Sequence, residues 1–205
     1  MSVFTKSLGA AGVVCALTAA AHGQVNGYTF TVDSSRSTFR VTGNALGLPL
    51  SGDRTAAIGG TIRTRIKTTG STINGFIIDG SVIDQLDPLR PQIDNPIPFL
   101  PPLEEFEILN VSTQVTTGPT RTAANGSFNV TDGAILFLDG TFEATGIVDI
   151  PLTPLAGEGQ SPVLFAGTLT AVGSVYELRL PLNFVFDNGT VHIEVQGDVV
   201  ATATR

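Results

Sequence analysis

The fold class follows most directly from Tyr176-Glu-Leu-Arg-Leu-Pro-Leu-Asn-Phe-Val-Phe186, where every even-numbered residue is large and apolar. Most of the odd-numbered positions are polar, so a strand here would bury one face. Asp187-Asn188-Gly189 then supplies residues that tolerate positive φ in a tight turn. The residues after the turn alternate again, with Val191, Ile193 and Val195 on the apolar side. The sequence therefore predicts a β-hairpin over 176–196.

The same two-residue alternation recurs along most of the chain. It is found in the stretches Tyr28–Val32, Phe39–Val41, Ile58–Lys67, Ile73–Ile83, Phe106–Val115, Ser127–Val130, Ile135–Ile150 and Val163–Val172. Turn-forming Gly, Asp and Asn separate these stretches, and none shows the three- and four-residue apolar spacing of a helix. We expect an all-β domain of ten to twelve short antiparallel strands with little helix, arranged as a β-barrel or a β-sandwich.

One proline stands inside the clearest strand. Pro181 lies on its polar face, and proline cannot donate to a β-ladder. A proline within a strand indicates a sheet edge or a bulge. It therefore weighs against a fully regular closed barrel.

A second feature is the proline-rich segment 88–102, which holds six of the twelve prolines of the chain. Because proline lacks the N–H that a ladder needs, we expect an extended, polyproline-like loop here rather than a strand. A long crossover between sheets is the simpler interpretation. A lid over a cavity or a docking segment is the alternative, since long structureless loops are uncommon in compact domains.

The first 23 residues have the pattern of a secretory signal peptide. Lys6 precedes an apolar run over 8–17, and small residues at 19–23 offer two cleavage points. The run is shorter than the roughly 20 apolar residues that cross a bilayer. Lipid attachment at Cys15 is a second interpretation of the same leader. We expect a secreted or periplasmic protein without a transmembrane segment, folded as a single domain over 24–205.

Composition after the leader excludes several kinds of chemistry. Residues 24–205 carry 10 Lys and Arg against 18 Asp and Glu, a net charge of −8, which disfavours nucleic acid and anionic membranes as partners. They contain no Cys, Met or Trp and a single His, His192, which the alternation places on an outward face beside Glu194. These absences argue against a thiolate metal site, a Ser–His catalytic pair and an indole platform for sugars.

Carboxylates are the remaining catalytic candidates. They are densest at Glu104, Glu105 and Glu107, and a pair of them could serve a glycosidase. Only Tyr28 and Tyr176 would assist in sugar binding, and both are expected to point inward. We therefore expect a protein that is not an enzyme and that holds no metal and no cofactor.

Two stretches resemble known protein groups. The opening Tyr28–Val41 resembles the start of YceI-like, polyisoprenoid-binding exported proteins, although Arg36 stands where that family has a histidine. The resemblance implies a lipocalin-like antiparallel barrel around an apolar ligand. The closing stretches 178–182 and 197–202 are similar to uncharacterised exported β-rich bacterial proteins, which implies no activity.

Two functions remain open from the sequence. The first is binding of a small apolar or lipid-like ligand in a cavity lined by inward phenylalanines, for which the candidates are Phe137, Phe142, Phe165, Phe184 and Phe186. The second is a structural or adhesive cell-surface or extracellular module whose sheets pack face to face without a cavity. The partner would be an apolar small molecule or a cell-envelope component, and the sequence leaves the oligomeric state open.

Overall fold

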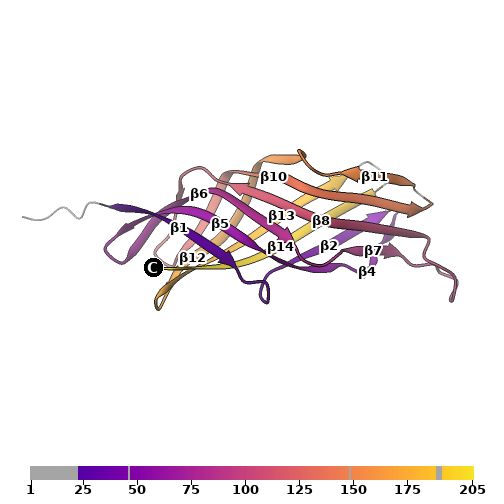
Figure 1. Ribbon diagram of the computed structural model, residues 1–205, viewed down its shortest axis with the longest axis horizontal. Helices are drawn as coiled ribbons and strands as arrows, with labels where there is room; N and C mark the ends of the chain where they lie inside the picture. The colour runs from indigo at the N-terminus through magenta and orange to yellow at the C-terminus, as the bar shows by residue number, and fades with distance from the viewer. Residues whose placement is uncertain (1–22, 46, 148, 188–190) are drawn as a thin grey trace, which may run out of the picture.

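A computed structural model describes residues 23–45, 47–147, 149–187 and 191–205, without the side chain of Phe186. Every regular element in these residues is a β-strand, which confirms the all-β prediction (Figure 1). The strands are β1 (Gln24–Val32), β2 (Thr38–Ala45), β3 (Leu48–Pro49), β4 (Ser51–Asp53), β5 (Thr55–Thr69), β6 (Thr72–Gln85), β7 (Arg90–Ile93), β8 (Glu104–Thr116), β9 (Thr120–Arg121), β10 (Ser127–Gly146), β11 (Ile150–Pro154), β12 (Gly159–Val172), β13 (Val175–Asp187) and β14 (Val191–Thr204). Their number exceeds the expected ten to twelve because β3, β4 and β9 are only two or three residues long.

The strands form one antiparallel sheet that closes on itself. Hydrogen-bonded neighbours run from β10 through β12, β13, β14, β1, β5, β6 and β8, and β8 pairs again with β10. β1 and β2 share the place between β14 and β5, since each of them pairs with both strands. β11, β7 and β4 extend the sheet at the end opposite the C-terminus (Figure 1). Of the two expected architectures, the ladders therefore describe a barrel-like ring.

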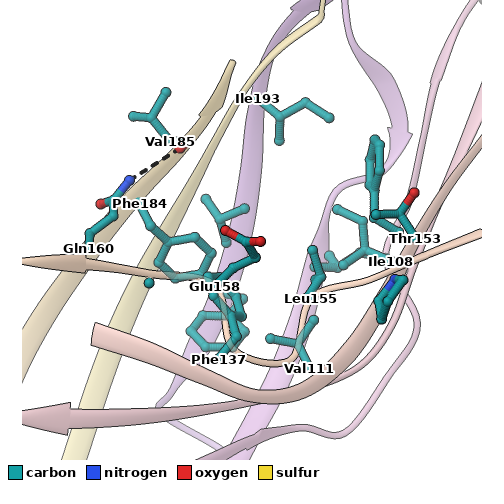
Figure 2. Close-up of a pocket in the computed structure, with 16 residues that line it drawn as sticks. Ile108, Val111, Phe137, Thr153, Leu155, Glu158, Gln160, Phe184, Val185 and Ile193 are labelled. Atoms are coloured by element: carbon teal, nitrogen blue, oxygen red, sulfur yellow. Dashed lines mark hydrogen bonds between the residues drawn. The ribbon is translucent and has the colours of Figure 1, made fainter. Parts of the chain in front are cut away.

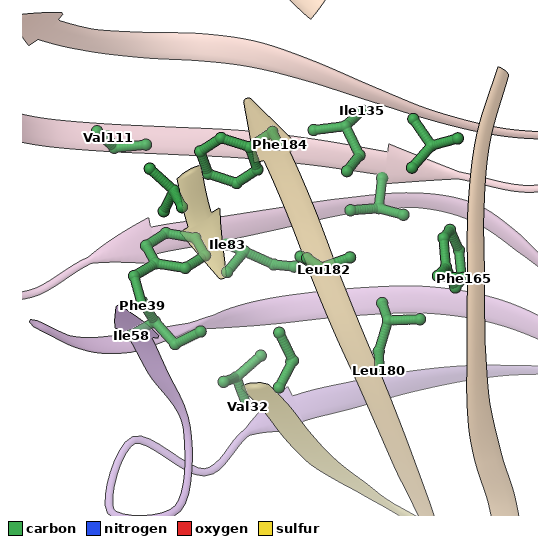
Figure 3. Packing of buried hydrophobic residues seen from close by; sticks show 14 of the residues in the cluster. Val32, Phe39, Ile58, Ile83, Val111, Ile135, Phe165, Leu180, Leu182 and Phe184 are labelled. Atoms are coloured by element: carbon green, nitrogen blue, oxygen red, sulfur yellow. The ribbon is translucent and has the colours of Figure 1, made fainter. Parts of the chain in front are cut away.

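The predicted hairpin is present as β13 and β14. The two strands pair continuously from Val175 with Thr204 to Asp187 with His192; the turn at 188–190 lies outside the described residues. The even-numbered side chains from Tyr176 to Phe184 are buried, and Pro181 and Asn183 are exposed. Together with side chains from across the ring, such as Ile58 and Ile83, they form the apolar core (Figure 3).

The outer face of β5 is polar. Along β5, Ile62, Thr64 and Ile66 are buried, whereas Arg63, Arg65 and Lys67 between them are exposed. Arg65 forms an ion pair with Asp79 of β6 at 2.6 Å on this face. The alternation along this strand thus directs polar side chains to the solvent and mostly apolar side chains to the interior of the ring.

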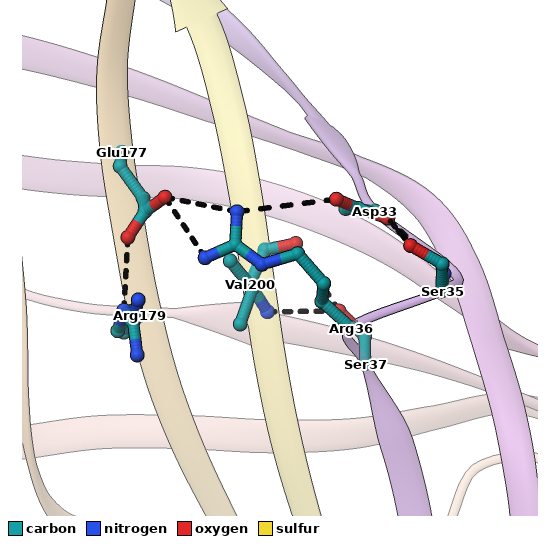
Figure 4. Close-up of polar contacts among 7 residues, drawn as sticks. All are labelled: Asp33, Ser35, Arg36, Ser37, Glu177, Arg179 and Val200. Atoms are coloured by element: carbon teal, nitrogen blue, oxygen red, sulfur yellow. Dashed lines mark hydrogen bonds and ion pairs between the residues drawn. The ribbon is translucent and has the colours of Figure 1, made fainter. Parts of the chain in front are cut away.

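A buried serine closes the ring where β1 ends and β2 begins. The Ser37 hydroxyl donates to the Val200 carbonyl at 3.1 Å and accepts from the Val200 N–H at 2.9 Å (Figure 4). The side chain thereby takes the role of a strand backbone toward β14. The neighbouring residue Arg36 forms an ion pair with Glu177 of β13 at 3.0 Å, and Arg179 forms an ion pair with the same carboxylate at 2.9 Å.

Side chains also complete the joint between β6 and β8, where only two residue pairs are in backbone register. The buried Ser81 hydroxyl accepts from the Val115 N–H at 2.7 Å, and the Thr117 hydroxyl accepts from the Ile78 N–H at 2.9 Å. Gln85 donates to the Ile108 carbonyl at 2.8 Å. Polar side chains thus satisfy backbone groups that a regular ladder would otherwise pair.

The prediction that 88–102 is a loop throughout is wrong over its first part. Arg90–Ile93 form β7, which pairs with β4 on one side and with β8 on the other. Pro91 removes one N–H from the ladder, but Leu89 and Ile93 on either side of it keep backbone hydrogen bonds to Ile108 and Leu103. Within the segment, Pro88 and residues 94–102 lie outside regular structure, and Leu89 forms an isolated bridge with Ile108.

Candidate functional site

An apolar cavity of about 320 Å³ lies within the ring, toward the end that carries β7 and β11. Figure 2 shows its lining. Its walls come from β2, β8, β10, β11, β12, β13 and β14 and from Leu89, which is bridged to β8. The lining residues are Phe39, Leu89, Ile108, Val111, Phe137, Phe142, Thr153, Pro154, Leu155, Glu158, Gly159, Gln160, Phe184, Val185, Ile193 and Val195.

Aromatic rings form one wall of this cavity. Phe184 packs edge to face with Phe137, with ring centroids 5.0 Å apart, and with Phe39 at 5.9 Å. Such edge-to-face pairs hold ring orientation as well as burying area. Ile108 and Val111 of β8 lie on the side across from the Phe184 and Phe137 rings (Figure 2). Phe142, another ring of the lining, is the cross-strand partner of Ile108, so the cavity offers an apolar ligand both rigid rings and branched aliphatic side chains.

The cavity opens where β12 and β13 part, a gap that we call the seam: residues 159–167 of β12 and 180–187 of β13. The register of the two strands ends at the pair Thr168 and Arg179, although both strands continue. Gly159 and Gln160 from one side of the seam and Phe184 and Val185 from the other line the cavity. The entrance to the cavity is therefore an interrupted ladder.

Pro181 explains why the ladder stops. The backbone N–H and C=O of Val200 bond to Ser37 and Asp33, so they point away from β13. Arg179 lies opposite Val200 in the β13–β14 ladder, and its backbone N–H and C=O therefore point away from β14, toward β12. Pro181, two residues further, faces the same way and has no N–H to donate. The strand proline therefore stands at an edge, one of the two positions that the sequence indicated for it.

Further along, the side chain of Gln160 bridges the seam. The Gln160 side-chain amide donates to the Val185 carbonyl at 3.2 Å (Figure 2). The 155–158 turn beside it is fixed by backbone hydrogen bonds, from Gly157 N–H to the Phe137 carbonyl at 2.9 Å and from Phe137 N–H to the Glu158 carbonyl at 2.8 Å. The entrance thus has a fixed rim and one bridging hydrogen bond.

The cavity contains little that could carry out chemistry. Glu158, which is exposed, is the one charged residue among the described residues that line it. His192 lies elsewhere, with its Nδ1 2.9 Å from Asp187 Oδ2. Within the described ranges, no group of three or more His, Cys, Asp and Glu side chains is placed to hold a metal ion.

The acidic residues of the sequence analysis do not form a catalytic pair in this cavity. Glu104 is buried, and Glu107 forms an ion pair with Arg90 at 2.9 Å on the outside of the sheet. Glu105 and Glu107 line a separate, polar hollow that also includes Glu143.

Three of the five predicted phenylalanines, Phe137, Phe142 and Phe184, line the cavity. Phe165 does not: it is buried in the core, where its ring covers Gly133 of β10 (Figure 3). The Phe186 side chain lies outside the described residues, while its backbone pairs with Ile193. Sequence reasoning missed Phe39 and the β8 residues Ile108 and Val111 as cavity-lining residues. The alternation indicated that their side chains point inward, but it did not indicate that they lie beside a cavity.

Comparisons with known proteins give no family. No protein-family model matches the chain, and no curated protein matches its sequence. Among solved structures, the chain is similar to the crystal structure of Ail, the attachment invasion locus protein of Yersinia pestis, in complex with the heparin analogue sucrose octasulfate. The match has 11% identity and a TM-score of 0.37, and covers 89% of this chain and 97% of that chain. A likeness this weak assigns neither a family nor a function.

In the described part of the chain, there is no helix that is long and apolar enough to span a bilayer.

Proposed function

We propose that this protein is an exported, non-enzymatic domain that binds a small apolar or lipid-like molecule in the seam cavity, the 320 Å³ space lined by Phe137, Phe142 and Phe184. The observation that carries the proposal is this cavity with its apolar walls and open entrance. Its volume lies at the lower end of the roughly 300–1,000 Å³ of small-molecule sites. Two sheets that simply packed face to face would fill the space, so the cavity favours the ligand over the purely structural role.

The size of the cavity limits the ligand. It is about twice the ~150 Å³ of an engineered apolar cavity that binds benzene. A molecule of one or two rings fits entirely, and a longer chain fits in part, with the remainder leaving through the seam beside Gln160. Glu158 at the rim disfavours an anionic group at that position.

The test is titration with the apolar fluorescent probe N-phenyl-1-naphthylamine. Thr153 of β11 lines the cavity and is exposed, so Thr153→Phe adds volume at the cavity wall with little demand on the core. Thr61→Phe is the matched control, because Thr61 is an exposed strand residue outside the lining. We expect the first variant to weaken probe binding at least about tenfold and the control to leave it unchanged.

Native mass spectrometry of protein purified from its own host provides a second measurement. We expect a copurified apolar molecule that organic extraction removes. A protein that repeatedly emerges ligand-free, and that also fails to bind the probe, would refute the proposal.

A further inference from the structure

The remaining part of the proline-rich segment projects an apolar tip, which we define as residues 95–102. Ile97, Phe99 and Leu100 are 59%, 105% and 52% exposed. The segment extends beyond the strand ends, at the end of the molecule opposite the C-terminus (Figure 1). Residues 96–101 are all exposed, and three of the six have large apolar side chains. Soluble protein surfaces normally carry such side chains singly and scattered.

Hydrogen bonds within the tip fix its backbone conformation, and this conformation exposes the three apolar side chains. The Ile97 N–H donates to the Asn95 side-chain oxygen at 3.0 Å, and the Leu100 N–H donates to the Ile97 carbonyl at 3.4 Å. Phe99 has φ of 71°, a left-handed conformation that is unfavourable for a bulky residue. Backbone strain of this kind tends to occur at functional positions.

The base of the tip is tied to the sheet. The Leu103 N–H donates to the Ile93 carbonyl at 2.8 Å, and the Ile147 N–H donates to the Leu103 carbonyl at 3.2 Å. The Ile147 side chain is itself exposed. The apolar surface at this end therefore includes the turn after β10 and is hydrogen-bonded to the sheet at its base.

The chemistry of the tip suits a lipid surface. Residues 95–102 carry no charge, and four of the eight are prolines without an N–H. Two of the four remaining amides are bonded within the tip, as described above, so few backbone donors lose water when it enters an apolar phase. Exposed Asp94 and Glu105 beside the tip disfavour an anionic membrane.

We propose that the tip, through Ile97, Phe99 and Leu100, inserts into the interface of an uncharged, zwitterionic lipid surface. This inference does not depend on the cavity, although the two features share one end of the molecule: the tip follows β7, and β7 begins directly after Leu89, which lines the cavity and bonds to Ile108. A protein docked in this way would present its cavity near the source of an apolar ligand.

The first test is flotation of the exported protein with phosphatidylcholine vesicles. Ile97→Ser/Phe99→Ser is compared with Val25→Ser/Val172→Ser, which removes two exposed apolar side chains outside the tip, 56% exposed on β1 and 55% exposed on β12. We expect the tip variant to lower the partition coefficient at least about tenfold, since each buried apolar side chain favours binding, and the control to stay at the wild-type value. Circular dichroism and thermal unfolding check that both variants fold.

The second test uses the absence of Trp from the sequence. Phe99→Trp makes residue 99 the sole indole, so a blue shift with phosphatidylcholine vesicles, and quenching by brominated lipid, report insertion at that position. Absence of binding to protein-free vesicles, equal loss in the control variant, or binding only to anionic vesicles would each overturn the proposal. A blue shift that rises with protein concentration in the absence of vesicles would overturn it in favour of self-association. Probe titration without vesicles measures the cavity separately, so failure of one proposal is distinguishable from failure of the other.

Discussion

Substitution of Ser37 by alanine tests the argument that a side chain closes the ring. Ser37 is fully buried, and its hydroxyl makes hydrogen bonds with both polar groups of Val200. In Ser37→Ala the Val200 carbonyl keeps the Asp33 N–H at 2.8 Å, so only the Val200 N–H is left without its partner. A buried, unsatisfied amide costs about 1–3 kcal/mol. We therefore expect the free energy of unfolding to fall by about 2 kcal/mol.

The assay is urea unfolding followed by far-ultraviolet circular dichroism. We expect a lower midpoint with an unchanged slope and a melting temperature lower by roughly 4–8 °C. Ser35→Ala is the matched control, because Ser35 is exposed and its hydroxyl bonds only to Asp33 in the same turn; it should stay within about 0.5 kcal/mol of the wild type. The reasoning would be refuted by a Ser37→Ala protein as stable as this control.

Three further predictions concern other parts of the ring. Among the described side chains, the buried Thr64 hydroxyl has no hydrogen-bond partner, so Thr64→Val should raise the free energy of unfolding by about 1 kcal/mol, and a lower urea midpoint would contradict this. Hydrogen bonds from Arg179 and then Arg36 lower the pKa of Glu177 from its ordinary 4.5, so their contribution is present above pH 4.5 and is lost as the pH falls through the lowered value. Glu177→Gln should therefore be less stable than the wild type at pH 6, by less than about 1 kcal/mol, with a difference that shrinks by pH 3; a pH-independent difference would count against the ion pairs. Gln160→Ala removes the bridge across the seam and should speed release of the naphthylamine probe by roughly two- to tenfold in stopped-flow measurements, and an unchanged rate would place the ligand's route elsewhere.

The sequence could predict each strand that alternates regularly, because alternation depends only on which neighbouring positions are apolar. Tyr176 to Phe184 and their partners after the turn are the clearest example, and their burial is as the pattern indicated. Strand β7 was missed because Pro91 suggested that no ladder was possible. The structure shows that a ladder tolerates one missing donor when the residues on both sides of the proline keep their bonds.

Closure of the ring could not be predicted, because it depends on long-range hydrogen bonds made by individual side chains. Ser37 and Ser81 each satisfy backbone groups of a strand distant in sequence, and nothing local distinguishes them from surface serines. The cavity could not be predicted from the sequence for a similar reason. Alternation shows that Phe137 and Phe165 both point inward, but whether an inward side chain faces a gap or a neighbour depends on where two strands part. The local signs of that place are two prolines, Pro181 on β13 and Pro162 on β12.

The position of β14 in the ring has a consequence for how the fold is completed. This strand pairs with β13, β1 and β2, so it joins the β13–β14 hairpin to two strands from the opposite part of the described sequence. Until residues 191–204 have been synthesised, β13 and β2 each lack the neighbour that covers their edge, and an uncovered edge is a template for association with other chains. Closure must also await contacts between residues nearly the whole chain apart, which makes it slow. A chain of this topology keeps these two edges uncovered, and available to other chains, until β14 has formed.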